Sequence, residues 1–118
     1  MEQQRPKHDL EERTLNFAKQ VVAFVHFLKP TLANVEIIKQ VVRSSGSVGA
    51  NYIEANEALS KKDFALRVKI CRKEAKETKY WLQLIEVEGD DLNGKRQMLV
   101  NEAIEITKIF GAIVEKTT

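Results

Sequence analysis

The sequence predicts an all-α protein, an antiparallel up-down-up-down bundle of four helices. Three observations lead to this fold class. Only two prolines interrupt the 118 residues. Apolar residues recur at spacings of three and four in each segment between the breaks, and the connections between segments are a few residues long, which makes successive helices antiparallel neighbours. At this length we expect residues 1–118 to form one domain with one core.

The first helix is expected over about residues 10–28, where apolar positions repeat with helical spacing. Pro30 ends it, because the residue before a proline is disfavoured in the helical region. The second helix is expected over about residues 35–59, and either Thr31 or Asn34 can cap its start.

The segment 43–49, RSSGSVG, is the weak point of the second predicted helix. Its two glycines lower helix propensity by about 1 kcal/mol each, so a loop is the alternative to the helix that we predict. Ser45 and Gly49 are four residues apart on the apolar face. Small residues at these two positions would let another helix approach closely.

The third helix is expected over about residues 61–88, opened by Ser60 with Asp63 three residues later as a capping arrangement and stopped by Gly89. The fourth is expected over about residues 95–116, after the turn-rich stretch Gly89 to Gly94. The core positions of the third helix step alternately by four and three, a heptad pattern that favours nearly aligned packing: Phe64, Val68, Cys71, Ala75, Thr78, Leu82 and Ile85.

Composition excludes several classes of protein. Nineteen basic against seventeen acidic residues give a net charge of +2, too little for binding nucleic acid by bulk charge alone. The single cysteine, Cys71, excludes an intrachain disulfide framework and favours a reducing, cytoplasmic setting. The first twelve residues are polar with both charge signs, so we expect no secretory signal, and no apolar run approaches the length of a membrane span.

Residues 40–55 read QVVRSSGSVGANYIEA and are followed by Lys62, Asp63 and Phe64. This pattern resembles the signature of bacterial four-helix-bundle proteins named after intervening sequences in 23S rRNA genes. It is also similar to the accessory variability determinant (Avd) proteins of diversity-generating retroelements. The family pattern has an arginine, serines, a Ser-Ile/Val, an Asn and a Glu-Gly, then an Asp-Phe that opens the third helix. The likeness covers the two central helices in sequence and the outer two in length and periodicity.

Two positions depart from the family pattern. Ala55 stands where the family usually has glycine, and residues 72–75, RKEA, replace a small, polar run. The second departure makes the third helix more basic and favours the Avd-like branch. The resemblance implies a homopentameric ring of four-helix bundles. For the Avd-like branch it also implies binding of a reverse transcriptase and of nucleic acid, RNA or DNA, through a basic surface.

Basic residues cluster in the third predicted helix. Segment 61–79 holds eight Lys or Arg against three acidic residues, a surplus of five, so the remaining residues sum to −3. Such segregation suits contacts with phosphate backbones. The alternative is a solvated face whose lysines pair with Glu74, Glu77 and neighbouring helices. The candidate nucleic-acid-binding residues are Lys62, Lys69, Arg72, Lys73, Lys76 and Lys79.

A second group of polar residues lies along one edge of the second predicted helix: Arg43, Ser47, Asn51 and Glu54, at spacings of four, four and three. One hypothesis is a catalytic or ligand site. We favour the other, a buried polar network that fixes the register of the helices, with Glu77 facing Arg43.

No motif predicts an enzyme, a metal or a cofactor. Glutamates three residues apart invite a di-iron bundle, but such sites need Glu-x-x-His, and Arg5 and Ala23 occupy the positions three before His8 and His26. Tyr80 and Trp81 adjoin the basic cluster and could stack a base, although we interpret Trp81 as packing.

Apolar residues in the first and fourth helices extend around more of the circumference than one small bundle covers, so we expect a homo-oligomer: Phe17, Val22, Phe24, Phe27, Ile104, Ile106, Ile109 and Phe110. The predicted function is a non-enzymatic scaffold that binds nucleic acid and protein, an accessory subunit of a reverse transcriptase in a diversity-generating retroelement. The alternative is a structural or regulatory homo-oligomer that binds protein only. No membrane partner is expected.

Overall fold

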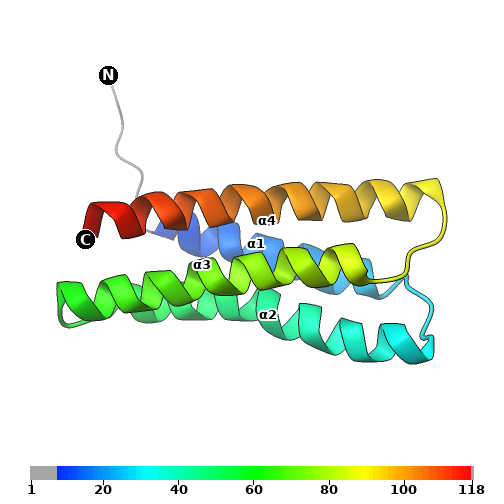
Figure 1. The fold of residues 1–118 in the computed structure, drawn as a ribbon, viewed down its shortest axis with the longest axis horizontal. Helices are drawn as coiled ribbons and strands as arrows, with labels where there is room; N and C mark the ends of the chain where they lie inside the picture. The colour runs from blue at the N-terminus through cyan, green and yellow to red at the C-terminus, as the bar shows by residue number, and fades with distance from the viewer. Residues whose placement is uncertain (1–7, 118) are drawn as a thin grey trace, which may run out of the picture.

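The computed structural model describes residues 8–117, and every regular element in that range is an α-helix. The predicted all-helical class, with four helices in one bundle, is confirmed. The chain turns back at each connection, so that α1 and α3 point toward one end of the bundle and α2 and α4 toward the other (Figure 1). The helices are α1 (His8–Val25), α2 (Leu32–Asn56), α3 (Lys61–Leu84) and α4 (Asp90–Thr117).

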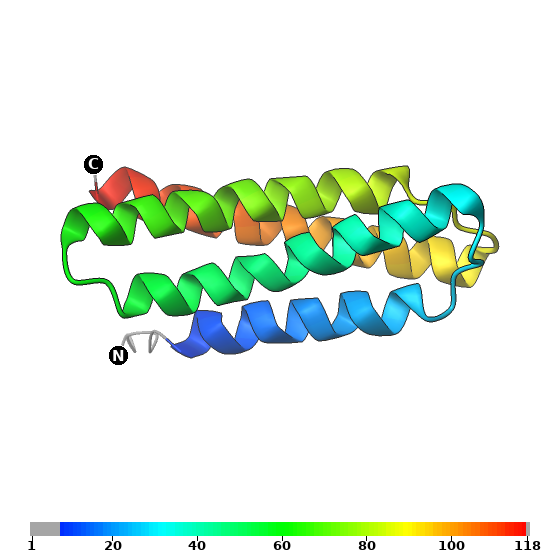
Figure 2. The same ribbon diagram turned by 90° about the horizontal axis from the view of Figure 1, so that it is seen from below.

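The helices do not pack equally against one another. α2 lies between α1 and α3 (Figure 2), and the most extensive packing joins α2 to α3 and α3 to α4. α1 and α4 contact each other over a much smaller part of their length. The α3 surface therefore has a neighbour on two sides, and the groove between α1 and α4 is left partly open.

Two helices begin at caps that the sequence offered, Thr31 as one of two alternatives for α2 and Ser60 for α3. Thr31 Oγ1 accepts a hydrogen bond from the backbone N–H of Asn34 at 3.1 Å, so Thr31 is the cap and α2 starts at Leu32, three residues before the predicted start. Ser60 Oγ accepts from the N–H of Asp63 at 3.1 Å and caps α3. Both caps satisfy backbone donors that lack a partner in the first turn.

The predicted C-terminal ends of the first three helices, at residues 28, 59 and 88, are wrong by a turn. α1 ends at Val25, α2 at Asn56 and α3 at Leu84. Leu28 and Ile85 are nevertheless buried. Because these apolar residues pack back onto the core after the helix has ended, apolar spacing in the sequence continues beyond the helical backbone.

The start of the fourth helix is also corrected, from about residue 95 to Asp90. Gly89 has a φ of +92°, a conformation that glycine adopts without strain, and it precedes α4 instead of stopping α3. Asp90 and Asp91 place negative charge in the first turn, where the helix dipole favours it. The Asn93 side chain donates to the Gly89 carbonyl oxygen at 2.9 Å. These local interactions stabilise the first turn of α4, in a stretch whose composition predicts a turn.

Segment 43–49 is helical, as predicted, and the loop alternative is excluded. The core contains the seam of α3 with Cys71 fully buried. Of the eight apolar residues from which we expected an oligomer surface, only Val22 and Phe27 are exposed. The other six are buried or half-buried because the bundle itself covers them. They are Phe17, Phe24, Ile104, Ile106, Ile109 and Phe110.

The Asn34 side chain forms hydrogen bonds with two of the loops that connect the helices. Its Nδ2 donates to the carbonyl oxygens of Lys29 and Glu86 at 3.1 and 3.0 Å, and its Oδ1 accepts from the Glu86 N–H at 2.9 Å. Lys29 belongs to the connection between α1 and α2, and Glu86 to the connection between α3 and α4. These two connections lie at the same end of the bundle (Figure 1). One buried amide thus joins both loops.

None of the helices between residues 8 and 117 is both long enough and apolar enough to cross a membrane. Most of the N-terminal stretch for which we expect no secretory signal, residues 1–7, lies outside the described residues.

Candidate nucleic-acid interface

The basic residues of α3 lie mainly on its outer face. Val68, Cys71 and Ala75 are fully buried, so residues on the opposite side of the helix point outward. Four of the six candidate residues are exposed, and the remaining two are half-buried. The exposed four are Lys62, Lys69, Lys73 and Lys76, and the half-buried two are Arg72 and Lys79.

The half-buried pair lies on the side of α3 that faces α4. A Cβ on Gly111 of α4 would stand 3.8 Å from Arg72 Cδ, so the arginine stem lies over the α4 backbone at this glycine. Lys79 lines a groove of about 300 Å³ between the two helices. The other residues lining this groove are Lys76, Tyr80 and Gln83 of α3 and Ile104, Thr107 and Lys108 of α4.

None of the six basic residues forms an ion pair within residues 8–117. In the alternative interpretation, a solvated face, the lysines of α3 pair with Glu74 and Glu77. Both glutamates instead point toward α2 and contact Arg43. The positive charges on the outer face of α3 are therefore not neutralised by neighbouring carboxylates. Uncompensated cations in a row are the feature that attracts polyanions.

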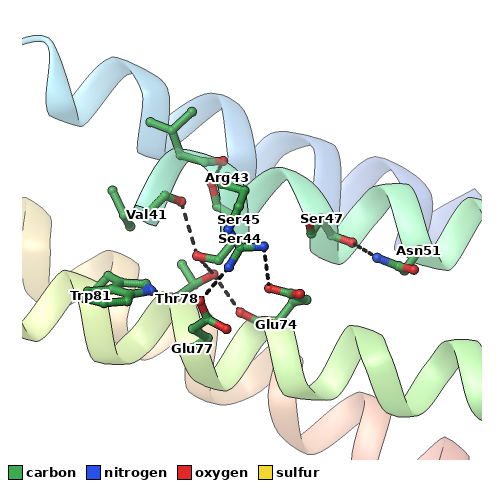
Figure 3. Close-up of polar contacts among 11 residues, drawn as sticks. Val41, Arg43, Ser44, Ser45, Ser47, Asn51, Glu74, Glu77, Thr78 and Trp81 are labelled. Atoms are coloured by element: carbon green, nitrogen blue, oxygen red, sulfur yellow. Dashed lines mark hydrogen bonds and ion pairs between the residues drawn. The ribbon is translucent and has the colours of Figure 1, made fainter. Parts of the chain in front are cut away.

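Arg43 of α2 binds both glutamates of α3 (Figure 3). Its Nη2 donates to Glu77 Oε2 at 2.5 Å, and its Nη1 lies 3.4 Å from Glu74 Oε1. Partial burial disfavours the charged guanidinium, but the hydrogen bonds and charges of the two carboxylates outweigh it, so the pKa of Arg43 lies above its ordinary value. Glu77 Oε2 also accepts from Trp81 Nε1 at 3.0 Å. Trp81 is half-buried and held by this bond, which agrees with a packing role.

The predicted network is less buried than expected. The Arg43 side chain is 47% exposed, whereas that of Glu74 is only 10% exposed. Because Arg43 reaches the carboxylates from the rim of the α2–α3 contact, its outer side stays in water. The deep members of the network are Glu74, Ser44 and Thr78.

Sequence reasoning missed the buried hydroxyl pair. Thr78 Oγ1 lies 2.8 Å from Ser44 Oγ and 2.8 Å from the Glu74 carbonyl oxygen, so α2 and α3 share a hydrogen bond inside the bundle. Buried polar groups require such partners. A threonine in the apolar heptad seam of α3 is the signal that could have indicated a polar partner on the facing helix.

The other residues of the predicted row on α2, Ser47, Asn51 and Glu54, form no side-chain hydrogen bond or ion pair with Arg43 or its glutamates within residues 8–117. Asn51 Oδ1 accepts from Arg67 Nη1 of α3 at 3.1 Å, and its Nδ2 donates to the Ser47 carbonyl oxygen at 2.9 Å. Ser47 thus takes part through its backbone. Glu54 is exposed and joins none of these residues within the described chain, so its assignment to the network is wrong. Its carboxylate stays hydrated because it lies on the solvent side of the row.

Two features bear on catalytic chemistry. Between residues 8 and 117, no cluster of three or more His, Cys, Asp and Glu is arranged to hold a metal ion. Burial raises the pKa of the Cys71 thiol to about 12, so the thiolate that acts as a nucleophile does not form near neutral pH. Cys71 is a core residue.

Residues 7–112 match the family described as 23S rRNA-intervening sequence protein. Among solved structures, the chain is similar to a crystal structure described as a protein with unknown function from the S23 ribosomal protein family of Bacteroides thetaiotaomicron VPI-5482. That likeness has a TM-score of 0.77 and 34% sequence identity, and it covers 88% of this chain and 96% of the other. Among curated proteins, none is a match.

Proposed function

This chain belongs to the 23S rRNA-intervening sequence protein family, and we propose that it is a non-enzymatic scaffold that binds nucleic acid and protein. One observation carries the proposal: six basic residues lie on and beside the outer face of α3, and no carboxylate within residues 8–117 pairs with them. Lysine and arginine in such a row bind successive phosphates and release counterions, with little dependence on base sequence.

Assembly is part of the proposal. The resemblance of residues 40–55 to the family signature supports a homopentameric ring of antiparallel bundles. Phe27 and Met98, 65% and 71% exposed, lie with Phe24 and Leu99 along the groove between α1 and α4, and an exposed apolar groove of this kind favours contact with another subunit. In a ring, each added copy of the basic face raises the effective concentration of the next, so weak phosphate contacts add to a high avidity.

The proposed protein partner is a reverse transcriptase, and the proposed setting is the cytoplasm. The likeness of residues 40–55 and 62–64 to Avd proteins supports this partner, as does the basic character of α3. A lone buried thiol, Cys71, suits a reducing compartment.

Charge reversal on α3 tests the nucleic-acid role. Lys69, Lys73 and Lys76 are exposed, so replacing all three by Glu leaves the core untouched, and Glu propagates a helix about as well as Lys. In fluorescence anisotropy at about 50 mM salt, we expect the unmodified protein to bind a labelled structured RNA or DNA, and the affinity to fall steeply as salt rises. The triple variant should lose at least about tenfold in affinity with unchanged circular dichroism and oligomeric mass.

A matched control separates position from net charge. Lys19, Lys39 and Lys116 are exposed on other helices, and replacing them by Glu changes the charge by the same amount. We expect this control to retain most of the affinity. Equal losses in both variants would show that only total charge matters and would contradict a site on α3.

The second candidate is a structural or regulatory homo-oligomer that binds protein only. The apolar groove beside Phe27 and Met98 favours it, because this surface suits a protein neighbour and contributes nothing to phosphate binding. Absence of nucleic-acid binding by the unmodified protein at about 50 mM salt would select this candidate.

A further inference from the structure

The groove between α3 and α4 combines positive charge with an aromatic ring. Lys76 and Lys79 on one side and Lys108 on the other surround Tyr80, which is 57% exposed. No carboxylate lines the groove. Lys108 has only a long contact of 3.7 Å with the exposed Glu105 in its own helix, and exposed pairs of this kind neutralise little charge.

The ring of Tyr80 packs against the side chain of Trp81. It meets Trp81 edge to face, with ring centroids 5.1 Å apart and an interplanar angle of 76°. Glu77 accepts one hydrogen bond from Trp81 and another from Arg43 of α2, so these bonds link the aromatic pair to α2. In an edge-to-face pair only one face of one ring is covered, so at least one face of Tyr80 stays free of Trp81. The contact with Trp81 restricts the ring, and a restricted ring loses less conformational freedom when a ligand stacks on it.

We propose that this groove holds an unpaired nucleotide, its base stacked on Tyr80 and its flanking phosphates bound by Lys76, Lys79 and Lys108. The inference rests on the proposed function and adds a preference for single-stranded over double-stranded nucleic acid. Aromatic stacking needs an exposed base face, which a duplex does not offer, whereas lysines bind the phosphates of either form.

Polar groups at the rim can contact the edge of the base. The Gln83 amide supplies both donors and an acceptor. Thr107 already donates its hydroxyl proton to the Ala103 carbonyl oxygen at 2.7 Å, so it can only accept from a base. This small set of groups fits any base, with no strong selection among them.

The test compares Tyr80→Leu, which removes the ring but keeps an apolar side chain, with Tyr80→Phe, which keeps the ring. Fluorescein-labelled oligo-dT and oligo-U of about 15 nucleotides and a duplex of the same length are titrated by anisotropy. We expect the unmodified protein to bind single strands more tightly than the duplex. Tyr80→Leu should weaken single-strand binding by about tenfold or more and change duplex binding less than about twofold, while Tyr80→Phe should behave like the unmodified protein. The two single strands show whether the groove distinguishes DNA from RNA.

A second readout uses the only tryptophan in the chain. Because Trp81 touches Tyr80, stacking on Tyr80 should change Trp81 fluorescence in the unmodified protein and in Tyr80→Phe, but not in Tyr80→Leu. Duplex binding as tight as single-strand binding, or unchanged single-strand binding by Tyr80→Leu, would overturn the inference and leave the phosphate-binding face of α3 standing. Absence of binding to all three probes would overturn both.

Discussion

Gly49 of α2 lies directly against Thr14 of α1, with no space for a side chain between them. A Cβ on Gly49 would stand 2.8 Å from Thr14 Oγ1 and 3.3 Å from Thr14 Cβ. Thr14 cannot easily move away, because it is fully buried and its hydroxyl donates to the Leu10 carbonyl oxygen at 2.8 Å. The small residue expected to allow close approach of another helix does so here, and the helix is α1.

Gly49→Ala should therefore destabilise the protein by about 1–3 kcal/mol, because a methyl group must displace packed atoms. Gly46 is the matched control: it is in the same helix and has open space where its Cβ would be. Gly46→Ala should stabilise by about 0.5–1 kcal/mol through helix propensity. Urea denaturation measures both, and similar effects of the two substitutions would refute the close contact.

Arg43→Ala should lower the free energy of unfolding by about 1–3 kcal/mol, because it leaves the buried Glu74 carboxylate without its cation. The cost is below that of breaking a fully buried pair because the Arg43 side chain is 47% exposed. Adding Glu74→Gln in the same chain removes the unpaired charge and should restore part of the loss. The control is Lys39→Ala, which removes an exposed pair within α2 and should change stability by less than about 0.5 kcal/mol.

The same variant distinguishes a structural network from a ligand site. If Arg43→Ala unfolds at the same urea concentration as the unmodified protein but no longer binds nucleic acid, Arg43 belongs to a binding site.

Alkaline pH should destabilise the fold through Cys71. The buried thiol keeps its proton up to a pKa of about 12, whereas an unfolded chain loses it near about 8.5. Between these values the folded state binds more protons than the unfolded state, so stability falls as pH rises, by at most about 1.4 kcal/mol per pH unit. Below about pH 8.5 this contribution is fully present. Cys71→Ala should show a shallower decline than the unmodified protein between about pH 9 and 11; parallel declines would show that Cys71 does not titrate in this way.

Assembly should depend on the groove between α1 and α4. Light scattering of the unmodified protein at micromolar concentration should give five times the subunit mass. Phe27→Glu, at a side chain that is 65% exposed, should reduce this mass without loss of helix content. Leu59→Glu is the control, since Leu59 is 97% exposed and lies between α2 and α3. A monomeric unmodified protein would contradict the ring.

Local signals in the sequence were sufficient for the four helices and for the start of α3, because the Ser60 cap depends only on a residue three positions away. For α2 they left Thr31 and Asn34 open as caps, and the structure has Thr31. The helix ends were not predictable from spacing, since Leu28 and Ile85 pack into the core from non-helical backbone. The partners in the polar network were not predictable from spacing either. The carboxylates that Arg43 binds depend on how α2 and α3 cross, which the spacing within one helix does not give.

The hydrogen bonds of Asn34 make the two ends of the bundle differ in how their loops are connected. At one end a buried amide ties the segment after α1 to the segment before α4, so neither loop can open without breaking bonds to the other. At the opposite end lie the turn between α2 and α3 and the final residues of α4 (Figure 1). Transient fraying should therefore begin at that second end, and amide hydrogens there should exchange with solvent sooner than those around Asn34.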